Sequence, residues 1–203
     1  MAILTANNQS LTEITALPSV ITTGSMVLLE TETASSSSTL DFTSGIDSTY
    51  DEYVFKFYDI HPSHASTDFE FNGSIDAGSN YNVTKTTTFV YCLHYESDAA
   101  VVVDYNGAAD IAQGTGYQRI CDNLSTANDA DVSGMFKLFN PSSTTFVKHF
   151  MSNVQSSRAD VIAENVLMAG YANTTSAVDA IQFKMSSGNI DAGDIKLYGI
   201  KDS

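Results

Sequence analysis

Acidic side chains are the first candidates for chemistry in this sequence. Asp68 and Glu70 are separated by one residue, so in a β-strand they share a face. Asp51 and Glu52 are adjacent further upstream. Two carboxylates at a suitable separation can serve as the acid and the base of a glycoside hydrolase. The chain contains 24 acidic residues, however, and in such a chain pairs of this kind arise by chance. We therefore predict no catalytic residue and a protein that is not an enzyme.

Histidines and clusters of Asn and Asp could hold a metal ion. His61 and His64 are accompanied by no Cys-x-x-Cys or His-Glu-x-x-His motif, so we expect exposed imidazoles in a loop. Residues 76–82, 123–131 and 189–194 are rich in Asn and Asp but do not match the twelve-residue calcium loop. These side chains also cap turns through the backbone. We predict turns and no cofactor, with a weakly bound structural calcium as the alternative.

Tyrosines provide the aromatic surface in a chain that contains no Trp. Their rings can stack on sugars by apolar contact, while the hydroxyl forms hydrogen bonds. Tyr81, Tyr105 and Tyr117 lie in or beside segments that we expect to be loops. We predict these three residues as candidate ligand-facing positions.

Length, charge and hydropathy narrow the classes of protein. A chain of 203 residues fits one β-sandwich domain. The net charge of -15 repels phosphate backbones, which argues against nucleic-acid binding. No run approaches the roughly 18 apolar residues of a membrane-spanning helix, so we predict no membrane insertion. Cys92 and Cys121 are too few for a disulfide framework, and we expect reduced thiols.

Alternating apolar and polar residues predict the elements that must position these side chains. About ten or eleven strands recur at short intervals without an amphipathic helix between them, which indicates an all-β, antiparallel β-sandwich that is jelly-roll-like. Residues 1–24 lack a clear period and predict an N-terminal arm, followed by a single sandwich domain at residues 25–203. The predicted strands cover residues 26–33, 52–60, 68–75, 86–93, 100–105, 117–122, 133–139, 145–153 and 163–171, with a closing pair after residue 180.

Three of these segments give sharper expectations. Residues 52–60 place Tyr53, Phe55 and Phe57 on one face and Val54, Lys56, Tyr58 and Ile60 on the other, which predicts a strand in the middle of a sheet. The segment 140–144 contains Pro141 and predicts a hairpin between two strands. The last two strands predict a second hairpin, whose irregular connection uses positive φ at Gly188 and Gly193.

Several phrases of the sequence resemble a family of tailed-bacteriophage virion proteins that are common in marine phages. They are FTSGIDSTYDEYVFKFYDIHP at residues 42–62, LFNPSSTTFVKHF at 138–150, AGYANTTSAVDAIQFKMSSG at 169–188 and KMSSGNIDAGDIKLYGI at 184–200. The resemblance covers roughly residues 40 to 200 and includes no catalytic signature. Members are generally uncharacterised, or labelled tail-fibre or structural proteins, so the resemblance implies a role in the virion.

The combined expectation is a non-enzymatic structural component of a tailed-phage virion. It would be a tail-fibre or receptor-binding domain, or a head decoration protein, assembled in the cytoplasm of the bacterial host. We expect a homo-oligomer, most simply a trimer, whose arm contacts other virion proteins. The alternative function is a glycan-binding β-sandwich module that recognises a host surface sugar.

Overall fold

A computed structural model describes residues 26–200 of the chain. The predicted arm at residues 1–24 and its partners lie outside this range and stay predictions. Residues 26–200 contain no helix, and hence none long and apolar enough to cross a membrane. The strands are β1 (Met26–Thr33), β2 (Leu40–Phe42), β3 (Glu52–Pro62), β4 (Thr67–Ser74), β5 (Lys85–Tyr95), β6 (Val101–Tyr105), β7 (Gln118–Leu124), β8 (Val132–Phe139), β9 (Lys148–Ser157), β10 (Ile162–Ala172), β11 (Ala180–Met185) and β12 (Ile190–Ile200).

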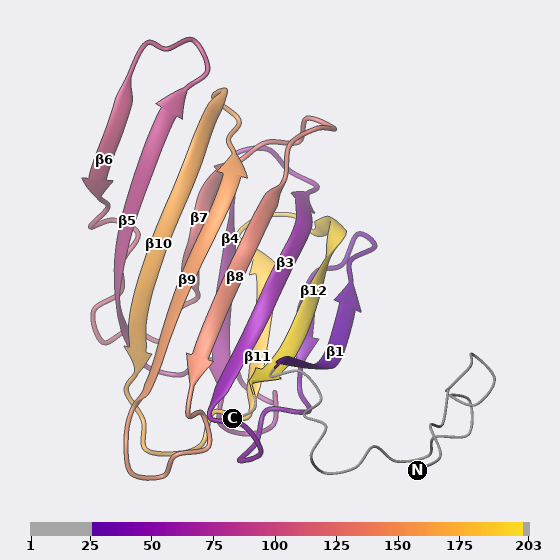
Figure 1. Ribbon diagram of the computed structural model, residues 1–203, viewed down its shortest axis with the longest axis vertical. Helices are drawn as coiled ribbons and strands as arrows, with labels where there is room; N and C mark the ends of the chain where they lie inside the picture. The colour runs from indigo at the N-terminus through magenta and orange to yellow at the C-terminus, as the bar shows by residue number, and fades with distance from the viewer. Residues whose placement is uncertain (1–25, 201–203) are drawn as a thin grey trace, which may run out of the picture.

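Two antiparallel sheets pack on each other as a β-sandwich (Figure 1). The larger sheet has eight strands in the order β1-β12-β3-β8-β9-β10-β5-β6, and the smaller has four in the order β2-β11-β4-β7. Without β5, β6, β9 and β10, two four-stranded sheets remain, β1-β12-β3-β8 and β2-β11-β4-β7. This is the strand order of a jelly roll, so the predicted fold is confirmed. The four additional strands extend the larger sheet on one side.

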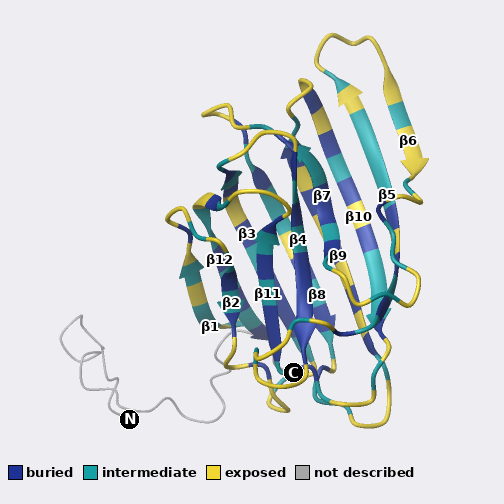
Figure 2. Cartoon of the chain, turned by 180° about the vertical axis from the view of Figure 1, so that it is seen from behind, coloured by how far each residue is buried: buried dark blue, intermediate teal, exposed yellow. Residues whose placement is uncertain are grey.

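Phenylalanine rings fill the space between the sheets. Phe183 on β11 is fully buried, and its ring centroid lies 5.3 Å from that of Phe55 and 5.2 Å from that of Phe57, both on β3. Phe42, Phe69 and Phe136 complete this central cluster. Most of these pairs meet edge to face, an arrangement that aromatic quadrupoles favour. Figure 2 shows buried positions along the strands of both sheets.

The predicted closing hairpin is wrong. β11 pairs with β2 and β4 in the smaller sheet, whereas β12 pairs with β1 and β3 in the larger one. The connection therefore crosses from one sheet to the other, and the predicted positive φ angles at Gly188 (74°) and Gly193 (113°) serve that crossing and a bulge in β12. Alternation marks both strands but carries no information on which sheet each one joins.

The structure confirms most of what was predicted for the strand at residues 52–60, which is β3. It lies between β12 and β8, and Tyr53, Phe55 and Phe57 face the core. Ile60 was expected on the opposite face but is fully buried in the core. The register of β3 shifts after Phe57 and Asp59 has a φ of 52°, which turns the following side chain back inward. The three-residue strand β2 was not predicted, because it is too short to show a period.

The hairpin predicted around Pro141 is confirmed. β8 and β9 are antiparallel neighbours, and the Ser143 N–H donates to the Asn140 carbonyl across the turn (3.1 Å). The segment between β6 and β8 is a loop interrupted by β7, as its Gly- and Asn-rich composition predicts. Its first part runs along the inner side of β5, where Ala109 is buried and the Ile111 N–H donates to Thr87 Oγ1 (2.8 Å).

Candidate functional site

The outer face of β9, β10, β5 and β6 carries no formal charge. Alternation and burial direct one set of side chains on these strands away from the core. None of them is Asp, Glu, Lys or Arg, although the chain has 33 such residues, 24 acidic and nine basic. We call this surface the uncharged face; its side chains are His149, Met151, Asn153, Gln155, Ala163, Asn165, Leu167, Ala169, Tyr171, Thr86, Thr88, Val90, Cys92, His94, Val101, Val103 and Tyr105.

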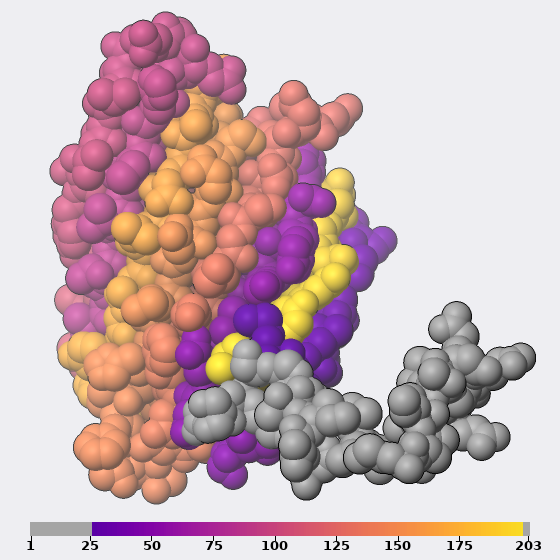
Figure 3. Space-filling view, viewed as in Figure 1, coloured from indigo at the N-terminus to yellow at the C-terminus, as the bar shows by residue number. Residues whose placement is uncertain are grey.

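Apolar side chains form a continuous band on this face. Strand register places Leu167 beside Val90, and Val90 beside Tyr105 at the edge of the sheet. Leu167 is 49% exposed and Met151 is 47% exposed. Together with Met135 on β8 they line a shallow hollow of about 480 Å³. In Figure 3, which looks onto this face, the orange surface of β9 and β10 adjoins the magenta surface of β5 and β6.

The remainder of the larger sheet carries lysines on its outer side. Lys137 Nζ lies 2.7 Å from Glu52 Oε1, and Lys56 and Lys196 extend over the rings of Tyr198 and Tyr58. These residues belong to β3, β8 and β12, the jelly-roll part of the sheet. The uncharged face is therefore confined to the additional strands, and Met135 and Lys137 on β8 lie at its border, beside Asn153 and Met151.

The smaller sheet has the opposite character. Its outward side chains, which we call the polar face, are Asp41 on β2, Asp68, Glu70 and Asn72 on β4, Arg119 on β7, and Gln182 and Lys184 on β11. Gln182 Nε2 donates to Asp41 Oδ1 (2.5 Å), and register sets Lys184 beside Glu70. Polar groups on this face thus bind one another across neighbouring strands.

Two of the three predicted tyrosines meet at the polar face. The Tyr117 hydroxyl donates to Gln182 Oε1, and Lys184 Nζ lies 4.6 Å from the centre of its ring. Burial raises the pKa of Tyr81 well above its usual range, and the nearby Asp41 carboxylate raises it further, although the Tyr81 hydroxyl has no hydrogen-bond partner of ordinary geometry. Tyr105 is distant from both, because it ends β6 on the uncharged face, where its hydroxyl donates to Asp110.

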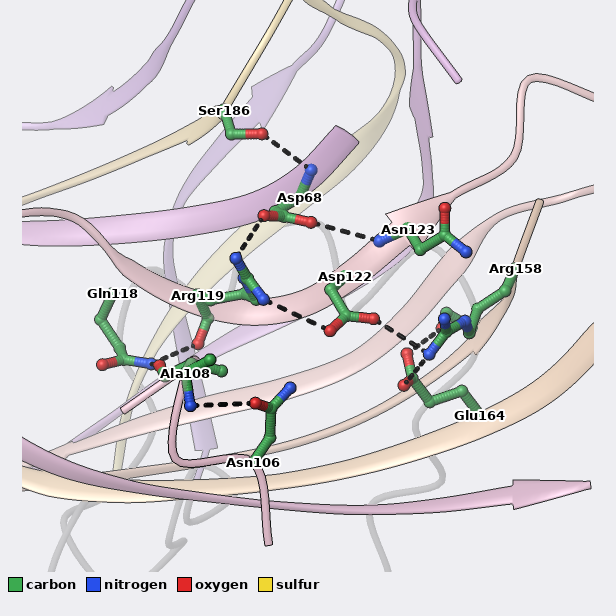
Figure 4. Close-up of polar contacts among 12 residues, drawn as sticks. Asp68, Asn106, Ala108, Gln118, Arg119, Asp122, Asn123, Arg158, Glu164 and Ser186 are labelled. Carbon is green, nitrogen blue, oxygen red and sulfur yellow. Dashed lines mark hydrogen bonds and ion pairs between the residues drawn. The ribbon is translucent and has the colours of Figure 1, made fainter. Parts of the chain in front are cut away.

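A chain of ion pairs connects the polar face to the larger sheet (Figure 4). Arg119 Nη2 lies 2.9 Å from Asp68, and Arg119 Nη1 lies 3.4 Å from Asp122. Arg158, in the turn between β9 and β10, places Nη1 3.1 Å from Asp122 and 3.0 Å from Glu164. These five residues, which we call the clasp, pass around the edge strand β7 and join β4 and β7 to β10.

Glu164 is the most deeply buried member of the clasp. It faces inward from β10 with none of its side chain exposed, and Ser156 Oγ donates to its second oxygen (3.3 Å). Burial raises the pKa of Glu164 to about 7, and Asp122 raises it as well, while Arg158 opposes both effects. The sequence offered a signal for this residue, since an acid occupies the apolar phase of a strand that continues with Val166 and Met168.

Asp68 and Glu70, the two carboxylates that share a strand face in the sequence, lie on the outward side of β4. Burial raises the pKa of both Asp68 and Glu70. Asp68, however, is bound by Arg119 and also accepts the Asn123 N–H (3.2 Å). Its carboxylate is therefore a member of the clasp, and this geometry assigns it a structural role.

The prediction of exposed imidazoles in a loop is confirmed for His64 and wrong for His61, which is half-buried in β3 because that strand continues to Pro62 through its pairing with β12. His61 Nε2 contacts the Ala127 carbonyl (3.2 Å), and His64 Nδ1 contacts the hydroxyl of Ser63 (3.1 Å). Asp76 accepts hydrogen bonds from Ser74 and Asn80, as expected for a turn. Residues 123–131 and 189–194 border an open hollow of about 580 Å³. The turn predicted at 189–194 is wrong, because β12 begins at Ile190 and pairs with β3 through this segment. Within residues 26–200, no three His, Cys, Asp or Glu side chains are arranged to hold a metal ion.

The two cysteines are free thiols, as predicted. Cys121 on β7 is fully buried and burial raises its thiol pKa, whereas Cys92 lies half-buried on the uncharged face.

No protein-family model, curated protein or solved structure matches this chain.

Proposed function

We propose that this protein is a non-enzymatic structural subunit of a tailed-phage virion, in the tail fibre or on the head surface, and that the uncharged face packs against a neighbouring protein. The observation that carries this proposal is the absence of charge from the outward side of four adjacent strands in a chain of net charge -15. Contiguous exposed apolar surface of this kind is typical of interaction sites. The phage-like phrases support the virion setting.

The position of the uncharged face on the sandwich also supports a role in binding a neighbouring protein. The uncharged face lies on strands that the jelly-roll core does not require, since β1-β12-β3-β8 and β2-β11-β4-β7 already form two complete sheets. Depletion of charge and enrichment of Met and aromatic residues are features of the centre of protein interfaces. Met151, Leu167 and Tyr105 provide such side chains.

The direct test is to ask whether the chain is present in purified particles of the phage that encodes it, by mass spectrometry of those particles. Incorporation is then measured for Leu167→Asp, which places a charge on the uncharged face. We expect incorporation to fall by at least about tenfold, because the carboxylate loses water in the interface. Ile75→Asp is the matched control, since Ile75 is similarly exposed (44%) and lies in the loop after β4.

Absence of the chain from purified particles would overturn the proposal. Equal loss of incorporation in Leu167→Asp and Ile75→Asp would remove the uncharged face from it.

A second candidate function is recognition of a host surface sugar at the polar face. It is favoured by Tyr117, whose hydroxyl donates to the amide oxygen of Gln182, and by Tyr81, which lies near Tyr117 and Asp41, since rings and planar polar groups together suit sugar binding. A glycan array with the full chain tests this function. Binding that disappears in Tyr117→Ala and survives in Tyr105→Ala would support it, and the absence of binding to any glycan would contradict it.

A further inference from the structure

The free edge of β6 borders the uncharged face. Among residues 26–200, β6 pairs with β5 alone, at the end of the larger sheet. Val101 is 72% exposed and Val103 is 75% exposed, the highest values among the large apolar residues of the described chain. An exposed apolar edge strand is a template for pairing with another strand.

Hydrogen bonds within the hairpin show which backbone groups this edge presents. The Tyr95 N–H donates to the Ala100 carbonyl (3.1 Å), and the Asn106 N–H donates to the Phe89 carbonyl (2.9 Å). Hydrogen-bonded and non-hydrogen-bonded pairs alternate in an antiparallel ladder, so residues 102 and 104 also face β5. Val101, Val103 and Tyr105 therefore direct their N–H and C=O groups away from the sheet.

The opposite edge of the sheet is better protected. β1 contains Glu30 and Glu32, and its register with β12 shifts between Leu28 and Glu30. Charged side chains and bulges are the means by which natural edge strands avoid pairing. β6 has one such feature, Asp104, whose carboxylate accepts the Tyr105 N–H (2.8 Å).

We propose that β6 pairs antiparallel with β6 of a second copy of this chain about a two-fold axis at Val103. This inference rests on the proposed assembly role and names one partner for it. In this register Val103 lies opposite its own copy, Val101 lies opposite Tyr105 and Val102 lies opposite Asp104. No carboxylate then faces another directly, and the pairing of Tyr105 with a β-branched residue is a favourable one.

The pairing joins the two larger sheets edge to edge. Val101, Val103 and Tyr105 follow Val90 on the same side of the sheet, so the two uncharged faces become one surface. The interface is self-complementary and closes as a dimer. This proposed dimer differs from the trimer that was predicted from the sequence.

The test is the mass of the full-length purified chain in solution, measured by light scattering over a wide range of concentration. We expect a dimer for the natural chain and a monomer for Val103→Pro, with the dissociation constant raised by at least about a hundredfold. The N–H of Val103 points outward, so proline removes a donor only from the intermolecular ladder. Val103→Thr is the matched control and should remain a dimer, because it keeps both the donor and the β-branched shape.

Hydrogen exchange gives a second measurement that does not depend on a substitution. The amides of Val101 and Val103 should gain protection as the concentration of the natural chain rises. Circular dichroism and thermal melting establish that Val103→Pro is folded; if it is not, Val103→Lys takes its place.

The inference would be overturned by a monomer at every concentration, by a dimer unchanged in Val103→Pro or its lysine substitute, or by a trimer. A series of growing oligomers would indicate pairing of β6 with β1 of the next copy and would also overturn it. Failure here is distinct from failure of the proposed function. A monomer that is found in purified particles removes the β6 dimer alone, whereas a β6 dimer absent from particles removes the virion role alone.

Discussion

The two outer faces of this sandwich differ in the kind of side chain that they leave exposed. On the polar face, Asp41, Glu70, Gln182 and Lys184 have neighbours of complementary charge or hydrogen-bonding capacity within the chain. On the uncharged face, Met151, Leu167 and Val103 remain exposed with no apolar partner above them in residues 26–200. The polar face is thus satisfied by its own side chains, whereas the uncharged face leaves apolar area for another molecule to bury.

The difference between the two faces also separates residues that stabilise the fold from residues that bind another molecule. Residues of the clasp hold the two sheets together, so changes on that side should alter the free energy of unfolding. Outward residues of β9, β10, β5 and β6 should contribute little to folding and more to association. The following changes test this distinction, from the largest expected effect to the smallest.

The largest loss of unfolding free energy is expected for a substitution in the core. Phe55→Ala should cost about 3–5 kcal/mol of unfolding free energy, because a fully buried ring leaves a cavity in the aromatic cluster. Leu167→Ala, on the uncharged face, should cost less than about 1 kcal/mol, because half of its side chain is already in water. Urea unfolding of both variants measures the difference. Equal losses would mean that the uncharged face is part of the core.

The clasp should make stability depend on pH. The pKa of Glu164 is raised to about 7 in the folded protein, above its unfolded value, so the folded state binds the extra proton and loses stability as pH rises through this range. The loss amounts to at most about 3 kcal/mol between pH 4.5 and pH 8. Glu164→Gln keeps the shape and removes the titration. Unfolding curves across this range should show a flatter profile for the variant, and parallel profiles would contradict the assignment.

The buried Lys85 allows a test of how a charge on the inner side of β5, beneath the uncharged face, affects stability. Lys85 on β5 is almost completely buried, its Nζ donates to the Gly116 carbonyl (2.6 Å), and burial lowers its pKa to about 8. The unfolded chain holds this proton more tightly, so stability should rise with pH between about 8 and 10.5. Lys85→Met should therefore stabilise the protein by about 1 kcal/mol at pH 7. Thermal melting at pH 7 and pH 10 compares the two chains, and a destabilised variant would mean that the Gly116 hydrogen bond outweighs the buried charge.

The smallest effects are expected at single tyrosine hydroxyls, one on each face. Tyr117→Phe removes the hydrogen bond to Gln182 and should cost about 1 kcal/mol. Tyr105→Phe removes an exposed hydroxyl at the end of β6 and should cost less than Tyr117→Phe. Urea unfolding checks both. A larger loss for Tyr105 than for Tyr117 would reverse the expected order of the two faces.

Alternation along the chain was sufficient to predict most of the fold. It marked eleven of the twelve strands and the common face of Tyr53, Phe55 and Phe57, because side-chain direction in a strand depends on local geometry. Turn composition likewise predicted positive φ at Gly188 and Gly193. These features follow from residues that are close together in the sequence.

The tertiary structure alone decided which strands are neighbours and which polar residues meet. Pairing depends on contacts between segments distant in sequence, so the closing strands could be mistaken for a hairpin although they join different sheets. For the same reason the clasp, with Asp68, Asp122 and Glu164 on three strands, was not predicted. The uncharged face was also not predicted, because its residues come from two separate hairpins and become one surface only where β10 pairs with β5.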